Sequence, residues 1–204
     1  PPWIGGAARL CSPALWSLIR TVQMAGVLSS GPPSIHAYGL SPMQSPSPFV
    51  SRVLDIEKEW IDYNGHLNMA YYNVLFDRGA DEAFALLGMG PDYARDRKLT
   101  TYTAEIHVCY VRELHLGHRV RSSLQLLDHD EKRFHYFQEL LHEDGWLAAT
   151  SEVLTLHVDM TGPRVAPFPP DIMSRLEDMR AAHAALPSPE RAGRSIGIRR
   201  KAPG

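Results

Sequence analysis

The run NMAYYNVLFDRGADEAFALLG, residues 68–88, decides the fold that the sequence predicts. Its apolar and small residues recur at spacings of three and four, which is the period of one helical face. Asn68 is a residue type that caps helix N-termini, and Gly88 is placed to end the helix. The apolar face comprises Tyr72, Leu75, Phe76, Gly79, Ala80, Ala83, Phe84 and Leu87. Because several of these residues are small, we expect the helix to pack tightly against a sheet.

The segments around this helix alternate with a period of two, which is typical of strands. We expect one strand over 50–56 before the helix, four strands after it, and a short helix over 170–184. The four later strands are predicted over 100–111, 120–127, 134–141 and 146–158. Short turns join consecutive strands, so we expect them to pair antiparallel. The sequence therefore predicts an α+β fold in which an antiparallel sheet wraps around one long central helix.

Composition excludes several classes of protein. The chain has 204 residues, 44% of them hydrophobic, and a net charge of -2. Near-neutral charge argues against nucleic-acid or membrane partners. The two cysteines, Cys11 and Cys109, are far apart and form neither a disulfide framework nor a zinc motif. No nucleotide- or flavin-binding glycine motif occurs. We therefore predict no metal, no cofactor and a reducing cytoplasmic location.

The chain divides into three predicted regions. Residues 1–48 are rich in Gly, Pro, Ser and Ala, and no acidic residue precedes Asp55. This composition predicts a disordered or non-native N-terminal extension, with a transit segment as the alternative. The ordered domain is predicted over 49–184, and a Pro-, Gly- and Arg-rich tail over 185–204.

The stretch DYNGHLN, residues 62–68, places an acid and a turn directly before the helix. Asp62 has two interpretations: it fixes the turn through its own hydrogen bonds, or it acts as a chemical reagent. Gly65 lets the backbone approach a substrate oxygen closely. The N–H groups of Gly65 and His66 lead into the helix, where unpaired donors favour negative charge. The motif thus offers a carboxylate and oxyanion donors together.

Three further stretches complete a resemblance to a known family. WIDYNGHL at 60–67, AEIHVCYVRELHLG at 104–117 and LHVDMTGPRVAPF at 156–168 resemble hotdog-fold acyl-CoA thioesterases of the 4-hydroxybenzoyl-CoA type. Within that family the match is closest to betainyl-CoA thioesterases of carnitine breakdown, which GRSIGI at 193–198 also resembles. The resemblance implies hydrolysis of acyl-CoA and a homodimer or homotetramer with sites at the subunit interface.

Roles follow for individual residues. As catalytic residues we predict Asp62, Gly65 and His66, the last through its backbone more than its side chain. As substrate contacts we predict Asn64, Asn68, Tyr71, Glu105 and His107. If the acyl group carries a quaternary ammonium, a carboxylate such as Glu105 and an aromatic ring suit it. Each residue also has a structural interpretation, as turn former, helix cap or core residue.

Two further interpretations remain open at this point. A non-catalytic hotdog module would bind acyl-CoA as a sensor or scaffold, without needing a carboxylate beside the thioester. A hydratase would share the fold, but the helix after Asn68 contains no His. Candidates to hold CoA phosphates are Arg112, Arg119, Arg133 and Arg194.

Overall fold

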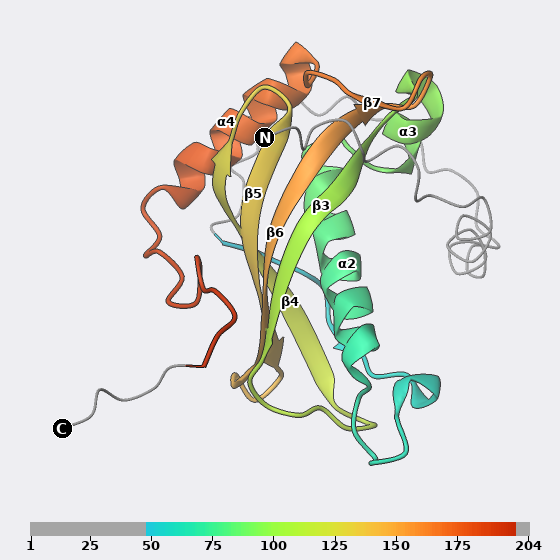
Figure 1. Ribbon diagram of the computed structural model, residues 1–204, viewed down its shortest axis with the longest axis vertical. Helices are drawn as coiled ribbons and strands as arrows, with labels where there is room; N and C mark the ends of the chain where they lie inside the picture. Colours follow the sequence, from blue (N-terminus) through green and yellow to red (C-terminus); the bar gives the residue numbers. More distant parts are fainter. Residues whose placement is uncertain (1–47, 199–204) are drawn as a thin grey trace, which may run out of the picture. The chain divides into compact units, whose positions relative to one another are not determined.

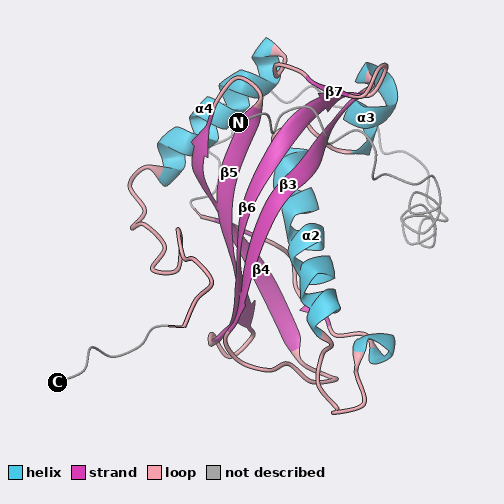
Figure 2. Cartoon of the chain, viewed as in Figure 1, coloured by secondary structure: helices cyan, strands magenta, loops and turns pink. Residues whose placement is uncertain are grey.

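The computed structural model describes residues 48–198 (Figures 1 and 2). The predicted extension therefore lies almost entirely outside the described residues, as do the last six residues of the tail. The helices are the short 3₁₀ helix η2 (Lys58–Trp60), α2 (Met69–Leu86), α3 (Pro91–Arg97) and α4 (Pro170–His183). The strands are β1 (Phe49–Val50), β2 (Leu54–Asp55), β3 (Leu99–Tyr110), β4 (Arg119–His129), β5 (Arg133–His142), β6 (Leu147–Asp159) and β7 (Arg164–Val165). No helix in this range is long and apolar enough to cross a membrane.

The strands form one antiparallel sheet in the order β1-β4-β5-β6-β3, and α2 runs along it (Figure 1). This confirms the predicted antiparallel sheet and long helix. The expectation that every consecutive pair of strands is adjacent was wrong for β3 and β4. Strand β3 pairs with β6 and forms one edge of the sheet, and β4 lies beyond β5. The connection over 111–118 therefore crosses from one side of the sheet to the other.

The predicted strand over 50–56 is interrupted. Its two ends, β1 and β2, each pair with β4 over two residues. Between them the N–H of Arg52 donates to the carboxylate of Glu82 in α2 at 2.9 Å. Because this N–H bonds the helix instead of the sheet, the ladder breaks there. The short α3, which the sequence reasoning missed, begins at Pro91, a residue favoured in the first helical turn.

A bulge in β3 changes which side chains face α2. The pairing with β6 shifts register between Thr103 and Glu105. As a result Thr103 and Ile106, three residues apart, both line a cavity against α2. The predicted alternation placed these two residues on opposite faces of the strand. The extra residue of the bulge explains the difference, because it shifts the alternation by one residue, so that every later side chain lies on the opposite face from the one predicted relative to Thr103.

Helix α2 packs on β4 through its smallest residue. A Cβ added at Gly79 would lie 2.4 Å from Cβ of Ser122, which no real packing allows. Gln138 of β5 ties the same region together: its side-chain amide donates to the carbonyl of Phe76 at 2.9 Å and to Oγ of Ser122 at 3.1 Å. The predicted tight contact of a thin helix face with the sheet is thus present at Gly79.

We predict that Gly79→Ala lowers the free energy of unfolding by about 1 kcal/mol. Alanine favours a helix by about 1 kcal/mol over glycine, but overpacking against backbone-anchored Ser122 costs about 1–3 kcal/mol. Urea unfolding measures the difference. The matched control is Ala85→Gly, at an exposed position of α2, which reports helix propensity without the contact. A stabilised Gly79→Ala protein would show that α2 can move away from the sheet freely.

Candidate active site

The predicted motif forms a tight hairpin at the N-terminus of α2. Ile61 and Leu67 pair across it, and the N–H of Asp62 donates to the carbonyl of His66 at 2.9 Å. The N–H of Gly65 donates back to the carbonyl of Asp62 at 3.0 Å. Gly65 has a φ of +80°, which other residues rarely adopt. The glycine is therefore required by the turn itself.

The carboxylate of Asp62 is half-buried and shapes this turn. One oxygen, Oδ1, accepts the N–H of Asn64 at 2.8 Å and, more weakly, the N–H of His66 at 3.4 Å. Within residues 48–198 the second oxygen, Oδ2, has no hydrogen-bond partner. The structural role and the chemical role are therefore compatible, because one oxygen holds the loop and the other remains available.

The expected oxyanion donors were wrong in one respect. The N–H of Gly65 is used inside the hairpin, and the N–H of His66 is directed at Asp62. The donor left over is the N–H of Met69, the first residue of α2, which has no partner within residues 48–198. Its position follows from the cap: Asn68 accepts the N–H of Ala70 through its side chain at 3.0 Å, confirming the predicted N-cap. The first helical N–H then stays free, as helix geometry requires.

A cavity of about 360 Å³ brings the carboxylate and this end of α2 together. Tyr72 and Tyr110 form one of its walls, their rings in edge-to-face contact at 5.1 Å. The hydroxyl of Tyr110 donates to the carbonyl of Met69 at 3.2 Å, which fixes the first peptide of the helix. Burial raises the pKa of both tyrosines, so their hydroxyls stay protonated. The lining residues are Asp62, His66, Leu67, Asn68, Met69, Tyr72, Tyr110, Val111, Arg112 and Glu113.

Two predicted substrate contacts have structural tasks here. Tyr71 stacks on Trp60, with ring centroids 5.4 Å apart, and does not line the cavity. The exposed Asn64 contributes its N–H to the carboxylate of Asp62. The helical period placed Tyr72 on the buried face of α2, and the structure shows that this core residue also lines the cavity. A substrate contact by Tyr71 stays a prediction.

Glu105 and His107 lie elsewhere in this chain. They line a separate cavity of about 710 Å³, together with Glu152 and residues of the C-terminal tail. The N–H of Gly193 donates to Glu152 at 2.7 Å, which holds the tail there. Within one chain the structure therefore does not bring Glu105 or His107 to Asp62. The bulge in β3 adds to this separation, since it sets the face of the strand on which both residues lie.

A third cavity, of about 300 Å³, lies between α2 and the strands β3, β5 and β6. Helix α2 lines it with Asn73, Val74, Phe76 and Asp77, one to two turns beyond Met69. Burial of the carboxyl group raises the pKa of Asp77. Burial and the neighbouring charge of Asp77 raise the pKa of Asp81 to about 6. Asp77 thus places a carboxyl group in this cavity, and its raised pKa means that the ionised form is less favoured than in water.

Of the four arginines considered for CoA phosphates, one lies at the Asp62 cavity. Arg112 is exposed, its guanidinium lies 4.2 Å from the ring centre of Trp146, and it forms no ion pair within the described part of the chain. Arg119 pairs with Asp55 and Glu143, and Arg133 pairs with Asp130. Arg194 lines the cavity of Glu105.

Comparison with known proteins identifies the family. The family model of the thioesterase-like superfamily matches residues 56–176. The chain belongs to this superfamily. The match includes the hairpin of Asp62, all of α2 and the four long strands. The fold is accordingly the hotdog fold, as predicted.

Curated relatives include a betainyl-CoA thioesterase of Pseudomonas aeruginosa, 40% identical over 69% of this chain and 89% of the relative. An L-carnitine dehydrogenase/betainyl-CoA thioesterase of Rhizobium meliloti is 35% identical over 71% of this chain. The matched region is only 29% of the length of that second relative.

Solved structures agree in fold. A Staphylococcus aureus protein, SAV2348, determined in complex with CoA, has a TM-score of 0.71 at 28% identity. The alignment covers 78% of this chain and all of that one. A putative thioesterase from Pseudomonas putida KT2440 has a TM-score of 0.63 at 29% identity, over 75% of this chain and 98% of that one.

Proposed function

We propose that this protein hydrolyses acyl-CoA thioesters, with betainyl-CoA as the substrate. The proposal rests on Asp62 and Met69 lining one cavity, the first with a carboxylate and the second with a backbone N–H that has no partner within residues 48–198. The choice of betainyl as the acyl group rests on the names of the curated relatives. The structure of a similar protein in complex with CoA supports CoA as the leaving group.

The chemistry requires a base or nucleophile and a donor for the developing oxyanion. The thioester carbonyl would accept the N–H of Met69, where the helix dipole favours negative charge. Asp62 would either attack the carbonyl carbon itself or remove a proton from an attacking water, and both routes give a tetrahedral oxyanion. The oxyanion collapses, the C–S bond breaks, and CoA leaves as a thiolate; its thiol has a pKa of about 8.5, so a general acid is unnecessary. With water as the nucleophile this step gives the free acid, whereas with Asp62 it gives an anhydride that water hydrolyses to the free acid and the Asp62 carboxylate.

A protein that only binds acyl-CoA, as a sensor or scaffold, is disfavoured by the same geometry. An uncompensated carboxylate beside a polarised carbonyl adds repulsion and no affinity for a neutral thioester. The free oxygen of Asp62 is useful only if it reacts or binds water. The family membership points in the same direction, since its curated relatives are named as thioesterases.

The groove beyond Met69 suits a short cationic acyl group. In a betainyl group the nitrogen lies about 2.5 Å from the carbonyl carbon, as in a peptide backbone. The trimethylammonium would then lie within one helical turn of the Met69 N–H, facing Asn73. Asp77 follows Asn73 by four residues on the same helix face and lines the same cavity. We therefore assign to Asp77 the attraction for the cation that the sequence had suggested for Glu105.

The remaining parts of the proposal concern assembly and location. Strand β3 is a twelve-residue edge of the sheet, and Ile106 and Tyr110 on it are 46% and 47% exposed. A long exposed edge with apolar side chains favours pairing with another chain. We propose a homodimer or a homotetramer that covers β3 and completes the site at the interface. A domain over 49–184 and a cytoplasmic location belong to the same proposal.

We predict that Asp62→Asn keeps the fold and lowers thioester hydrolysis at least about a hundredfold. The amide oxygen of asparagine still accepts the N–H of Asn64, so the turn survives without a base or nucleophile. Thiol release from betainyl-CoA measures the activity, and thermal unfolding measures the fold. Tyr63→Ala, at the 97% exposed neighbour, is the control. Near-normal turnover by a folded Asp62→Asn enzyme would reduce the carboxylate to a turn former.

We predict that Asp77→Asn lowers kcat/KM for betainyl-CoA at least about fivefold, or about 1 kcal/mol, because the Asp77 carboxylate attracts the ammonium. Tert-butylacetyl-CoA, the neutral isostere, should lose little. Glu105→Gln is the matched neutralisation in the other cavity and should change neither substrate. Equal losses for both substrates in Asp77→Asn would show that Asp77 only supports packing. A selective loss in Glu105→Gln would move the cation site to the 710 Å³ cavity.

A further inference from the structure

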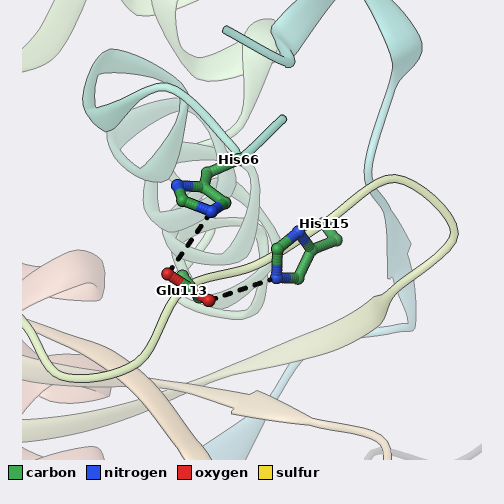
Figure 3. A group of neighbouring side chains, drawn as sticks. All are labelled: His66, Glu113 and His115. Atoms are coloured by element: carbon green, nitrogen blue, oxygen red, sulfur yellow. Dashed lines mark ion pairs between the residues drawn. The ribbon is translucent and has the colours of Figure 1, made fainter. Parts of the chain in front are cut away.

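Three potential metal ligands converge at the mouth of the Asp62 cavity (Figure 3). Nε2 of His66 lies 3.5 Å from one carboxylate oxygen of Glu113, and Nε2 of His115 lies 3.5 Å from the other. The three ligand atoms lie within 4.8 Å of one another. Both imidazole rings point toward the carboxylate, and all three side chains are accessible to solvent.

The backbone holds these side chains together although they are distant in the sequence. His66 belongs to the hairpin before α2, whereas Glu113 and His115 belong to the connection after β3. The two segments are joined by the N–H of Leu67, which donates to the carbonyl of Leu114 at 2.8 Å. Local spacing in the sequence gives only Glu113 and His115, because the third ligand, His66, belongs to a different segment.

The hydrogen bond of His115 fixes which nitrogen carries its proton. Nδ1 lies 3.1 Å from the carbonyl of Gly65. A carbonyl only accepts, so Nδ1 must be the protonated nitrogen. In the neutral ring Nε2 is then bare, and its lone pair faces the Glu113 carboxylate. A ring nitrogen lone pair and a carboxylate on the same side are two of the donor types that bind zinc. A backbone acceptor behind the ring is also what metal-binding histidines commonly have.

The spacing of the three side chains leaves room for one metal ion between them. Each imidazole Nε2 lies 3.5 Å from a different oxygen of Glu113, and the three ligand atoms lie within 4.8 Å of one another. Zinc binds nitrogen and oxygen at about 2.0–2.2 Å, which places neighbouring ligands of a tetrahedron about 3.4 Å apart, so side-chain rotations would bring the three groups onto one ion. By contrast His135 and Glu152, an ordinary pair on β5 and β6, are hydrogen-bonded at 2.9 Å.

We propose that His66, Glu113 and His115 form a binding site for a divalent transition metal of the zinc class. Two imidazoles and one carboxylate supply three ligands, and the fourth position is open to water. Glu113 and His66 also line the Asp62 cavity, so bound metal would clamp the hairpin to the connection after β3. The site does not depend on the proposed hydrolysis, because binding is measured without substrate.

Calorimetric titration of the chelator-treated full-length protein with zinc chloride tests the site. Wild type should bind one equivalent more than His115→Ala, and its melting temperature should rise with zinc. Glu113→Gln, at an exposed position, should weaken that equivalent more than about tenfold. Cobalt in place of zinc should give the visible absorption of a tetrahedral complex in wild type alone.

The matched control is His135→Ala, which removes a histidine–glutamate pair that lacks a third ligand. It should retain the zinc equivalent and the zinc-dependent rise in melting temperature. The proposal fails if wild type binds no zinc beyond the level of His115→Ala. It also fails if Glu113→Gln and His115→Ala, both folded by circular dichroism, bind zinc as wild type does. Binding abolished equally by His135→Ala would place the metal at the other pair.

Discussion

The close approach of α2 to the sheet is the constraint on which the rest of the structure depends. At Gly79 there is no space for a side chain above Ser122, and Gln138 bridges the sheet to the backbone of the helix. This contact fixes both the position of the helix along its axis and its rotation about that axis. The N-terminus of α2, about three turns earlier, is thereby set beside β3 and the Asp62 hairpin. Packing in the core therefore decides where the unpaired N–H of Met69 points.

The polar groups of the hairpin and of the first turn of α2 have two roles: most of them hold the local backbone together, and a few remain available to a substrate. Asn68 and the carbonyl groups of the hairpin satisfy the donors that the turn and helix would otherwise leave unpaired. The N–H of Met69 and Oδ2 of Asp62 both lack a hydrogen-bond partner within residues 48–198, and both residues line the same cavity. An unpaired polar group costs stability unless water or a ligand meets it. Their coincidence in one cavity is the physical argument for catalysis, and it needs no metal.

The sequence predicted the helix, its cap at Asn68 and the antiparallel strands because periodicity and capping are local properties. It could not place β3 at the sheet edge, since the hydrophobic pattern does not state which strands pair. It missed the bulge before Glu105, so the faces of Thr103 and Ile106 were assigned wrongly. The N–H groups of Gly65 and His66 were predicted as oxyanion donors because both residues precede the helix. In the structure both N–H groups bond inside the turn, so the N–H of Met69 is the donor that remains for a substrate. The separation of Glu105 from Asp62 is a property of the assembled sheet.

The most direct test of the account is a crystal structure with a betainyl-CoA analogue in which a methylene group replaces the thioester sulfur. The account predicts the ketone oxygen about 3 Å from the N–H of Met69, with the carbonyl carbon about 3–3.5 Å from the Asp62 carboxylate. The trimethylammonium should lie against Asn73, on the side of Asp77. An acyl group bound beside Glu105 and His107, with Asp62 and Met69 untouched, would contradict it.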